Sequence, residues 1–326
     1  MSGVELAQLD SKRPVRPLAT VSVDLDPVDV HLRGYGHFGT IPDPLVHRLA
    51  LPRLLVLFEK HGVRATFFVL ARDVPSEFEW LSVIRNSGHE IASHGMDHVA
   101  GISRLSDQEI RTELTGSRRR LESAIDAQVV GFRAPDWSAG RRLVSALDST
   151  GYRYDASLVP SPVLTAGRLV LAARARSVRD VMAVRLPPSL RRQPFKWTVD
   201  GRSVVEFPLA VSPRLRLPIY HTIRPNLSDV SFQRHLDGFA ERGESLSYAL
   251  HGVDALGLIE DGVDGRLRPH PGMAGKLDTK LALLDRTMAD IASRFVVSPF
   301  AERLSLNADP VPKTEPHVTS SRSGAS

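Results

Sequence analysis

The sequence predicts an α/β fold, in which seven or eight parallel strands and their following helices form an incomplete barrel. Short apolar runs alternate with amphipathic segments along most of the 326 residues, a pattern typical of a parallel sheet with right-handed crossovers. Polar residues directly follow several of these runs, as expected where the carboxyl ends of barrel strands form a site. A hydrophobic content of 42% is sufficient for the core of one large barrel.

The first half of the chain alternates strand and helix. Runs rich in β-branched and aromatic residues predict strands at 19–24, 65–70, 89–93, 129–133 and 152–155. Apolar residues at helical spacing predict helices at 42–61, 76–87, 106–126 and 141–150. Gly62, Gly88 and Gly151 follow three of these helices, where a C-terminal cap favours glycine. Ser106 and Glu109 have the spacing of a capping box.

The second half continues the alternation less regularly. Strands are predicted at 203–207, 246–250 and 294–297, and helices at 228–242 and 273–293. We therefore predict a single barrel domain over 19–305. A polar N-terminus at 1–18 is expected to be flexible, and the tail at 306–326, rich in proline, serine and threonine, to be disordered.

A basic insertion at 161–196 interrupts the rhythm. It carries seven arginines and Lys196 against the single acidic residue Asp180, with leucines and valines between them. Such a segment is typical of an amphipathic surface that faces anionic lipid or a phosphorylated substrate. A solvated helix beside the barrel is the alternative, and the sequence does not decide between the two.

Composition excludes several classes of function. The net charge is +5 and only 6% of residues are aromatic, which disfavours a nucleic-acid partner. The absence of cysteine excludes disulfides, thiolate metal sites and cysteine nucleophiles. Residues 1–17 contain no apolar stretch of a secretory signal, and no apolar run approaches 18 residues. We therefore expect a cytoplasmic protein, with peripheral contact at the inner face of the membrane as an open alternative and no prediction of oligomeric state.

Five short motifs carry the candidate chemistry, each at the end of a predicted strand. They are Asp24-Leu25-Asp26, His94-Gly95-Met96-Asp97-His98, Arg133-Ala134-Pro135, Asp155-Ala156-Ser157 and Leu250-His251. Each motif alone is weak, and the weight lies in their order and placement. Two imidazoles and one carboxylate bind zinc or a similar metal while leaving a position open for water. A carboxylate base, an arginine that orients it and a second histidine as acid complete the inventory for amide hydrolysis.

These motifs resemble those of the NodB-homology polysaccharide deacetylases, carbohydrate esterase family 4. The resemblance runs from about Val21 to about Phe300, and the stretch 161–194 has no clear counterpart. It implies a distorted, incomplete barrel of the NodB-homology type and a hydrolase of linear C–N amide bonds. It also implies one divalent metal, with zinc expected and cobalt, manganese or nickel as alternatives.

The resemblance also implies roles for single residues. Asp24 matches the catalytic base, Asp26, His94 and His98 the metal ligands, Arg133 the residue that orients the base, and His251 the general acid. Asp155 and Ser157 match a motif lining the substrate groove. Trp137 follows the arginine motif and is either a core residue or a platform for a sugar. Asp254 or Asp155 is the candidate to orient His251. We therefore add Trp137 and Asp254 to the predicted substrate site.

The first motif departs from the common form of the family, because Leu25 separates the two aspartates. This form resembles the branch of polyprenyl-phosphate sugar deformylases and glycolipid deacetylases. The expected reaction is removal of an acetyl or formyl group from an amino sugar, by metal-activated water, on a lipid or nucleotide carrier. Alternatives are a deacetylase of peptidoglycan or exopolysaccharide, an allantoinase-like hydrolase of small amides, and an inactive carbohydrate-binding barrel.

Overall fold

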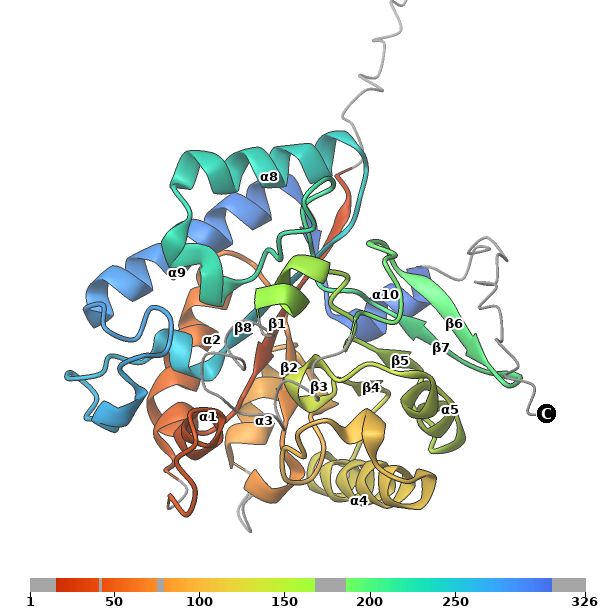
Figure 1. The fold of residues 1–326 in the computed structure, drawn as a ribbon. Helices are drawn as coiled ribbons and strands as arrows, with labels where there is room; N and C mark the ends of the chain where they lie inside the picture. The colour runs from red at the N-terminus through yellow and green to blue at the C-terminus, as the bar shows by residue number, and fades with distance from the viewer. Residues whose placement is uncertain (1–15, 41–42, 75–78, 168–185, 307–326) are drawn as a thin grey trace, which may run out of the picture.

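A single curled sheet with helices around its outer face forms the protein (Figure 1). The structure, a computed structural model, describes residues 16–40, 43–74, 79–167 and 186–306. In the order of their hydrogen-bonded neighbours, the strands run β6-β7-β5-β4-β3-β2-β1-β8, and β9 pairs with the start of β1. Among the described strands none joins β8 to β6, so the sheet is a half-barrel, as the sequence predicts.

All pairings are parallel except that of β6 with β7. The strands are β1 (Leu18–Asp24), β2 (Thr66–Val69), β3 (Glu90–Ser93), β4 (Gly131–Phe132), β5 (Tyr154–Asp155), β6 (Phe195–Val199), β7 (Arg202–Glu206), β8 (Leu246–His251) and β9 (Val296–Val297). The register sets Asp24 beside Phe68 of β2 on one side and His251 of β8 on the other. Residues just beyond these strand ends therefore meet at one rim.

Eight α-helices that lie wholly within the described part of the chain accompany the sheet. They are α1 (Val28–Gly34), α2 (Leu51–Lys60), α3 (Glu79–Asn86), α4 (Asp107–Ile125), α5 (Arg141–Ser149), α8 (Asp229–Glu241), α9 (Leu277–Arg294) and α10 (Phe300–Leu306). A π-helical turn (Val46–Ala50) leads into α2. The capping box predicted at Ser106 and Glu109 is present at the start of α4. In Figure 1, α8 and α9 lie side by side beyond β8 and β1.

Two hydrophobic clusters hold these layers together. The larger one lies between the sheet and the outer helices, and includes Val21, Val23, Phe67 and Leu250. The smaller one fills the concave side and consists of Phe68, Ala92, Tyr154, Ala156, Phe207 and Phe300. Because side chains alternate along a strand, one strand supplies both clusters. Phe300 belongs to α10, which therefore closes the amino-terminal end of the half-barrel.

The sequence missed three elements, β6, α1 and α10. The predicted insertion at 161–196 overlaps β6, so Lys196 is an exposed strand residue and its neighbours Phe195 and Trp197 are buried. Helix α1 follows Pro27 and has only seven residues, too few for a periodic signal. Residues 168–185 of the insertion, residues 1–15 of the predicted flexible terminus and residues 307–326 of the predicted tail lie outside the described residues.

No helix in the described ranges combines the length and the apolar character needed to cross a bilayer.

Candidate metal centre and active site

Asp26, His94 and His98 come together at the carboxyl-terminal rim of the half-barrel. His94 Nε2 lies 3.6 Å from Asp26 Oδ1, and His98 Nε2 lies 3.7 Å from Asp26 Oδ2. One ligand atom from each residue lies within 4.8 Å of the other two. Two ligands of one tetrahedral zinc ion are roughly 3.3–3.5 Å apart, so these separations suit a shared ion. The sequence prediction that these three side chains converge is confirmed.

The local backbone and hydrogen bonds present these ligands. His94 follows β3 directly, and its Nδ1–H donates to the carbonyl of Arg133 at 2.8 Å. In the neutral ring this bond leaves the lone pair on Nε2, the nitrogen that faces Asp26, as in metal sites where the second imidazole nitrogen is fixed by a carbonyl. Gly95 (φ 90°) and His98 (φ 54°) have left-handed backbone conformations, which turn the loop so that His98 returns to the rim.

The electrostatics of the three residues fit a cation. Asp26 is 3% exposed, and its buried Oδ1 makes no hydrogen bond. Burial opposes the charge on Asp26, yet His94 and His98 hold the pKa of this carboxyl far below its usual range. Burial alone would lower the pKa of His94, but the carboxylates of Asp26 and Asp24 raise this pKa to about 9. An unpartnered buried carboxylate oxygen beside two imidazoles is the donor set of a zinc-type site.

Asp24 lies next to this cluster and is held by Arg133. The guanidinium Nη1 donates to Asp24 Oδ1 at 2.6 Å, Nη2 donates to Ser22 Oγ at 2.9 Å, and Nε donates to the carbonyl of Ala156 at 3.0 Å. Both Asp24 and Arg133 are almost fully buried. A charge-assisted bond of this kind fixes the orientation of the carboxylate. The second oxygen, Oδ2, takes no part in that bond.

Two aromatic rings enclose the guanidinium of Arg133. Its Cζ lies 4.1 Å from the ring centroid of Phe68 and 4.5 Å from that of Trp137. Stacked cation–π contacts of this kind hold an arginine in place at low hydration. Trp137 therefore supports Arg133, and its use as a platform for a sugar stays a prediction.

His251 ends β8 on the other side of Asp24. Its Nε2 is 4.0 Å from Asp24 Oδ2, and its Nδ1 is 3.3 Å from the hydroxyl of Thr222. We expected Asp254 or Asp155 to orient the imidazole. Instead, Asp254 accepts a hydrogen bond from the backbone N–H of His251 at 2.8 Å, so it fixes the end of the strand. The imidazole ring is contacted by the hydroxyl of Thr222, which the sequence did not single out, and by the backbone N–H of Asp254.

Asp155 and Ser157 lie behind Arg133 and are fully buried. The Ser157 hydroxyl donates to Asp155 and accepts from the backbone N–H of Ala134 at 2.8 Å. Burial raises the pKa of Asp155 to about 6, and burial beside Asp155 raises that of Glu206 well above its usual range. Two carboxyl groups in one dry site share a proton. This arrangement supports the β4 and β5 ends, and direct substrate contact by Asp155 and Ser157 stays a prediction.

The sequence also missed a row of histidines beside His251. His31 of α1 lies edge-on to His251 and to His270, with ring centroids 5.5 Å and 5.1 Å away. The Nε2 atoms of His31 and His270 are buried and make no hydrogen bond. Burial lowers the pKa of His31 to about 3 and that of His270 to about 4, so both rings are neutral at pH 7. His31 follows Asp26 by five residues, and this short separation is the only feature of the sequence that could have placed His31 near the site.

A cavity of about 500 Å³ opens beside Trp137. Polar groups on its wall include Arg104 and Asp136, and apolar groups include Leu158, Leu164 and Leu186. Because Trp137 stacks on Arg133, which holds Asp24, this cavity borders the candidate centre. Binding sites in proteins are typically mixed cavities of this size.

Comparison with known proteins supports the domain type. Residues 42–154 match the family model described as Polysaccharide deacetylase. The matched segment contains His94, His98 and Arg133, whereas Asp24 and Asp26 precede it. Over 147 residues the chain is 30% identical to the peptidoglycan deacetylase of Helicobacter pylori. That alignment covers 44% of this chain and half of the relative, so the chain spans only half the length of this relative.

Solved structures share the fold. A protein of Mycobacterium smegmatis described as a polysaccharide deacetylase has a TM-score of 0.57 at 17% identity, over 94% of this chain and 97% of its own. One from Pseudomonas aeruginosa PAO1, described in the same way, has a TM-score of 0.55 at 16% identity, over 88% and 89%. The fold prediction is therefore confirmed, and the deacetylase resemblance is confirmed for the matched segment. The deformylase branch stays a prediction.

Proposed function

We propose that this protein is a metal-dependent hydrolase that removes an acetyl or formyl group from the nitrogen of an amino sugar. One observation carries the proposal. A three-residue metal cluster (Asp26, His94 and His98) lies beside a carboxylate, Asp24, which Arg133 orients on one side and His251 faces on the other. Amide hydrolysis requires a base, an acid and an electrophile within reach of one bond. Asp24 and His251 are the candidates for the first two, and the three-residue cluster would hold the ion that acts as the third.

A divalent ion held by Asp26, His94 and His98 would polarise the scissile carbonyl and acidify water. The remaining steps belong to side chains of this protein. Asp24 accepts the proton of the attacking water through Oδ2, while Arg133 keeps the carboxylate in place. His251, as imidazolium, gives a proton to the sugar nitrogen as the C–N bond breaks. Once the acid proton passes to the amine, the products are acetate or formate and the protonated amine. Asp24 and His251 return to their starting charges when the proton on Asp24 passes to His251 through solvent, so the atoms and charges balance.

For the carrier of the sugar we propose a lipid phosphate or a nucleotide. The cavity beside Trp137 supports this choice, because its wall combines an arginine, Arg104, with leucine and proline side chains. A substrate with a charged group and an apolar portion would use both kinds of surface. The second candidate substrate is peptidoglycan, which is favoured by the similarity to the Helicobacter pylori peptidoglycan deacetylase.

Mass spectrometry of reaction mixtures tests the proposal. The zinc-loaded protein is incubated with polyprenyl-phosphate and nucleotide-linked N-acetyl and N-formyl sugars, with N-acetylated peptidoglycan fragments and with allantoin. We expect loss of 42 or 28 mass units, within about 1 unit, on the lipid- or nucleotide-linked sugars. Asp24→Asn serves as the matched inactive variant. Turnover of the peptidoglycan fragments alone would select the second candidate, and no turnover of any N-acyl sugar would contradict the proposed function.

A further inference from the structure

The exposed leucines of the described chain lie in two short segments, 186–190 and 215–217. Twelve large hydrophobic residues are exposed, and all four leucines among them fall between residues 186 and 217. Leu186 is 74% exposed, Leu190 49%, Leu215 67% and Leu217 39%. Scattered exposed apolar residues need no explanation, but a cluster of large ones marks a surface that meets something apolar.

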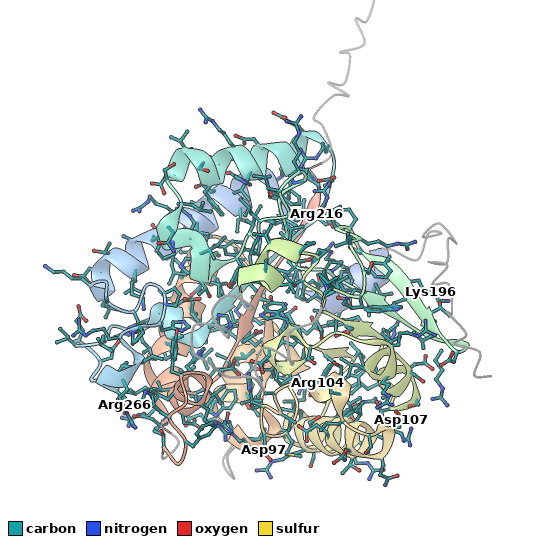
Figure 2. All side chains as sticks on the ribbon, in the orientation of Figure 1. Asp97, Arg104, Asp107, Lys196, Arg216 and Arg266 are labelled. Carbon is teal, nitrogen blue, oxygen red and sulfur yellow. The ribbon has the colours of Figure 1, made fainter. Side chains whose placement is uncertain are left out.

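Hydrogen bonds join the two segments that carry these leucines. Arg216 Nη1 donates to the carbonyl of Leu190 at 2.6 Å, and Ser212 and Leu217 close a tight loop by a backbone bond of 2.8 Å. Figure 2 labels Arg216 on this loop. We call Leu186, Leu190, Leu215 and Leu217, with Arg214 and Arg216, the leucine–arginine patch.

The patch is cationic as well as apolar. Its own charges are those of Arg214 and Arg216. Of the other basic residues between 186 and 220, Arg192 is paired with Glu244, and the acidic residues in this range are Asp200 and the fully buried Glu206. Within the described ranges no carboxylate lies within ion-pair distance of Arg214 or Arg216. Leucine side chains that enter the acyl boundary, flanked by arginines that meet anionic headgroups, are the two elements of peripheral membrane binding.

The patch is continuous with the cavity beside the active site. Leu186, Pro187 and Pro188 line that cavity, and Leu190 follows them in the patch. A surface that rests on a bilayer at this point would set the cavity mouth against the headgroup layer. A substrate carried on a lipid would then reach the rim without leaving the membrane.

We propose that the leucine–arginine patch docks this protein on an anionic lipid bilayer. Only the link between docking and substrate delivery rests on the proposed function; the docking itself does not. A protein partner or a second copy of the chain would require a complementary surface, whereas a bilayer requires only exposed apolar side chains and positive charge. The structure supplies both beside a cavity that borders the candidate centre.

Vesicle co-sedimentation tests this proposal without any amino sugar or metal. The full chain is mixed with vesicles of phosphatidylglycerol and phosphatidylcholine in equal parts, and with vesicles of phosphatidylcholine alone. We expect binding to the first, weak binding to the second, and release by 0.5 M salt because exposed charges are screened. Arg214→Ser/Arg216→Ser should weaken binding about tenfold or more.

Leu186→Ser/Leu215→Ser tests the apolar part, with Val56→Ser/Ile259→Ser as the matched control. All four side chains are at least two-thirds exposed, so each variant should keep the thermal stability of the wild type. The patch variant should bind anionic vesicles about tenfold more weakly, and the control should bind like the wild type. Absence of binding by the wild type would overturn the proposal. Equal binding by the Leu186→Ser/Leu215→Ser variant and its Val56→Ser/Ile259→Ser control would also overturn it. A dimer in sedimentation velocity that the patch variant abolishes would also overturn it, in favour of a second copy.

Discussion

Each end of the half-barrel shields a carboxyl group from solvent, but the two carboxyl groups differ in their hydrogen bonding. At the amino-terminal end, Glu90 receives hydrogen bonds on both oxygens, from Thr66 at 2.7 Å, Ala301 N at 3.0 Å and Tyr154 at 2.9 Å. Helix α10 covers this end, and Phe300 N donates to Thr66 Oγ1. At the carboxyl-terminal end, Asp26 Oδ1 is buried and has no hydrogen-bond partner.

We infer from this difference that the amino-terminal end serves stability and the carboxyl-terminal rim serves chemistry. A buried polar atom without a partner costs free energy, so it persists where a ligand or reaction uses it. At the carboxyl-terminal rim the unpartnered atoms include Asp26 Oδ1 and His31 Nε2, atoms that can bind a metal, beside Asp24 and His251. Near α10 the unpartnered atoms are Arg303 Nε and Ser298 Oγ, which belong to side chains that do not bind metals. We expect substitutions at this rim to remove activity with little loss of stability, and substitutions at the other end to do the reverse.

Asp24→Asn gives the largest expected effect on activity. The amide keeps the shape of the side chain but cannot accept a proton from water, so kcat should fall by about a thousandfold or more. Metal content should stay at the wild-type level, because Asp24 is not one of the clustered ligands. Steady-state kinetics with metal analysis measure both quantities. Full activity in this variant would remove Asp24 from the mechanism.

His251→Ala should separate amide from ester substrates. Without the imidazolium, cleavage of an amide should slow by about a hundredfold, whereas an activated ester, whose leaving group needs no proton, should lose much less. Rates on an acetylated amino sugar and on an aryl acetate give this comparison. Equal losses on the two substrates would contradict the role of His251 as general acid.

Glu90→Ala tests the opposite end of the barrel. The substitution leaves the donors of Thr66, Tyr154 and Ala301 without their acceptor, so the free energy of unfolding should fall by about 3 kcal/mol. Glu90→Gln retains an acceptor oxygen and should lose less. Denaturant unfolding gives the stabilities, and kcat per folded molecule should be unchanged in both variants. A loss of kcat larger than the loss of folded protein would break the proposed division between the two ends.

His89 should give the smallest effect, visible as a pH dependence of stability. Its Nδ1 accepts from Ala65 N at 3.0 Å, and burial lowers its pKa to about 4. On acidification His89 is therefore protonated in the unfolded chain before it is protonated in the folded protein, which favours unfolding. The contribution of His89 to the free energy of unfolding is complete above about pH 6.5 and is lost as the pH falls towards 4. Between pH 7 and pH 5 this loss should be about 2 kcal/mol. His89→Asn keeps the acceptor and should flatten the slope of unfolding free energy against pH; an unchanged slope would contradict the contribution of His89.

The sequence was sufficient for the strands and the parallel sheet of the first half, and for the convergence of the three candidate metal ligands. Asp26, His94 and His98 follow apolar runs, and parallel strands bring the ends of such runs to one rim. The short elements were missed because α1 and α10 have seven residues each. Their periodicity is too brief to stand out from a loop.

Contacts between distant segments could not be predicted from the sequence, for a different reason. Trp137 stacks on Arg133, and Thr222 faces His251 from a separate loop. A tryptophan or a threonine in a sequence does not indicate such a partner, because both contacts depend on how separate segments pack on the rim. The row formed by His31, His251 and His270 is a further example, since its members come from three distant parts of the chain.

Metal binding tests the central claim most directly. Metal-free protein is titrated with zinc and cobalt, and bound metal is measured for the wild type, for Asp26→Ala, His94→Ala and His98→Ala, and for His235→Ala as a control on α8. The account predicts one tightly bound ion per wild-type or control chain, and at least about a hundredfold weaker binding in each of the three cluster variants. A wild-type protein that takes up no divalent ion, or a His94→Ala variant that binds it as tightly as the wild type, would contradict the account.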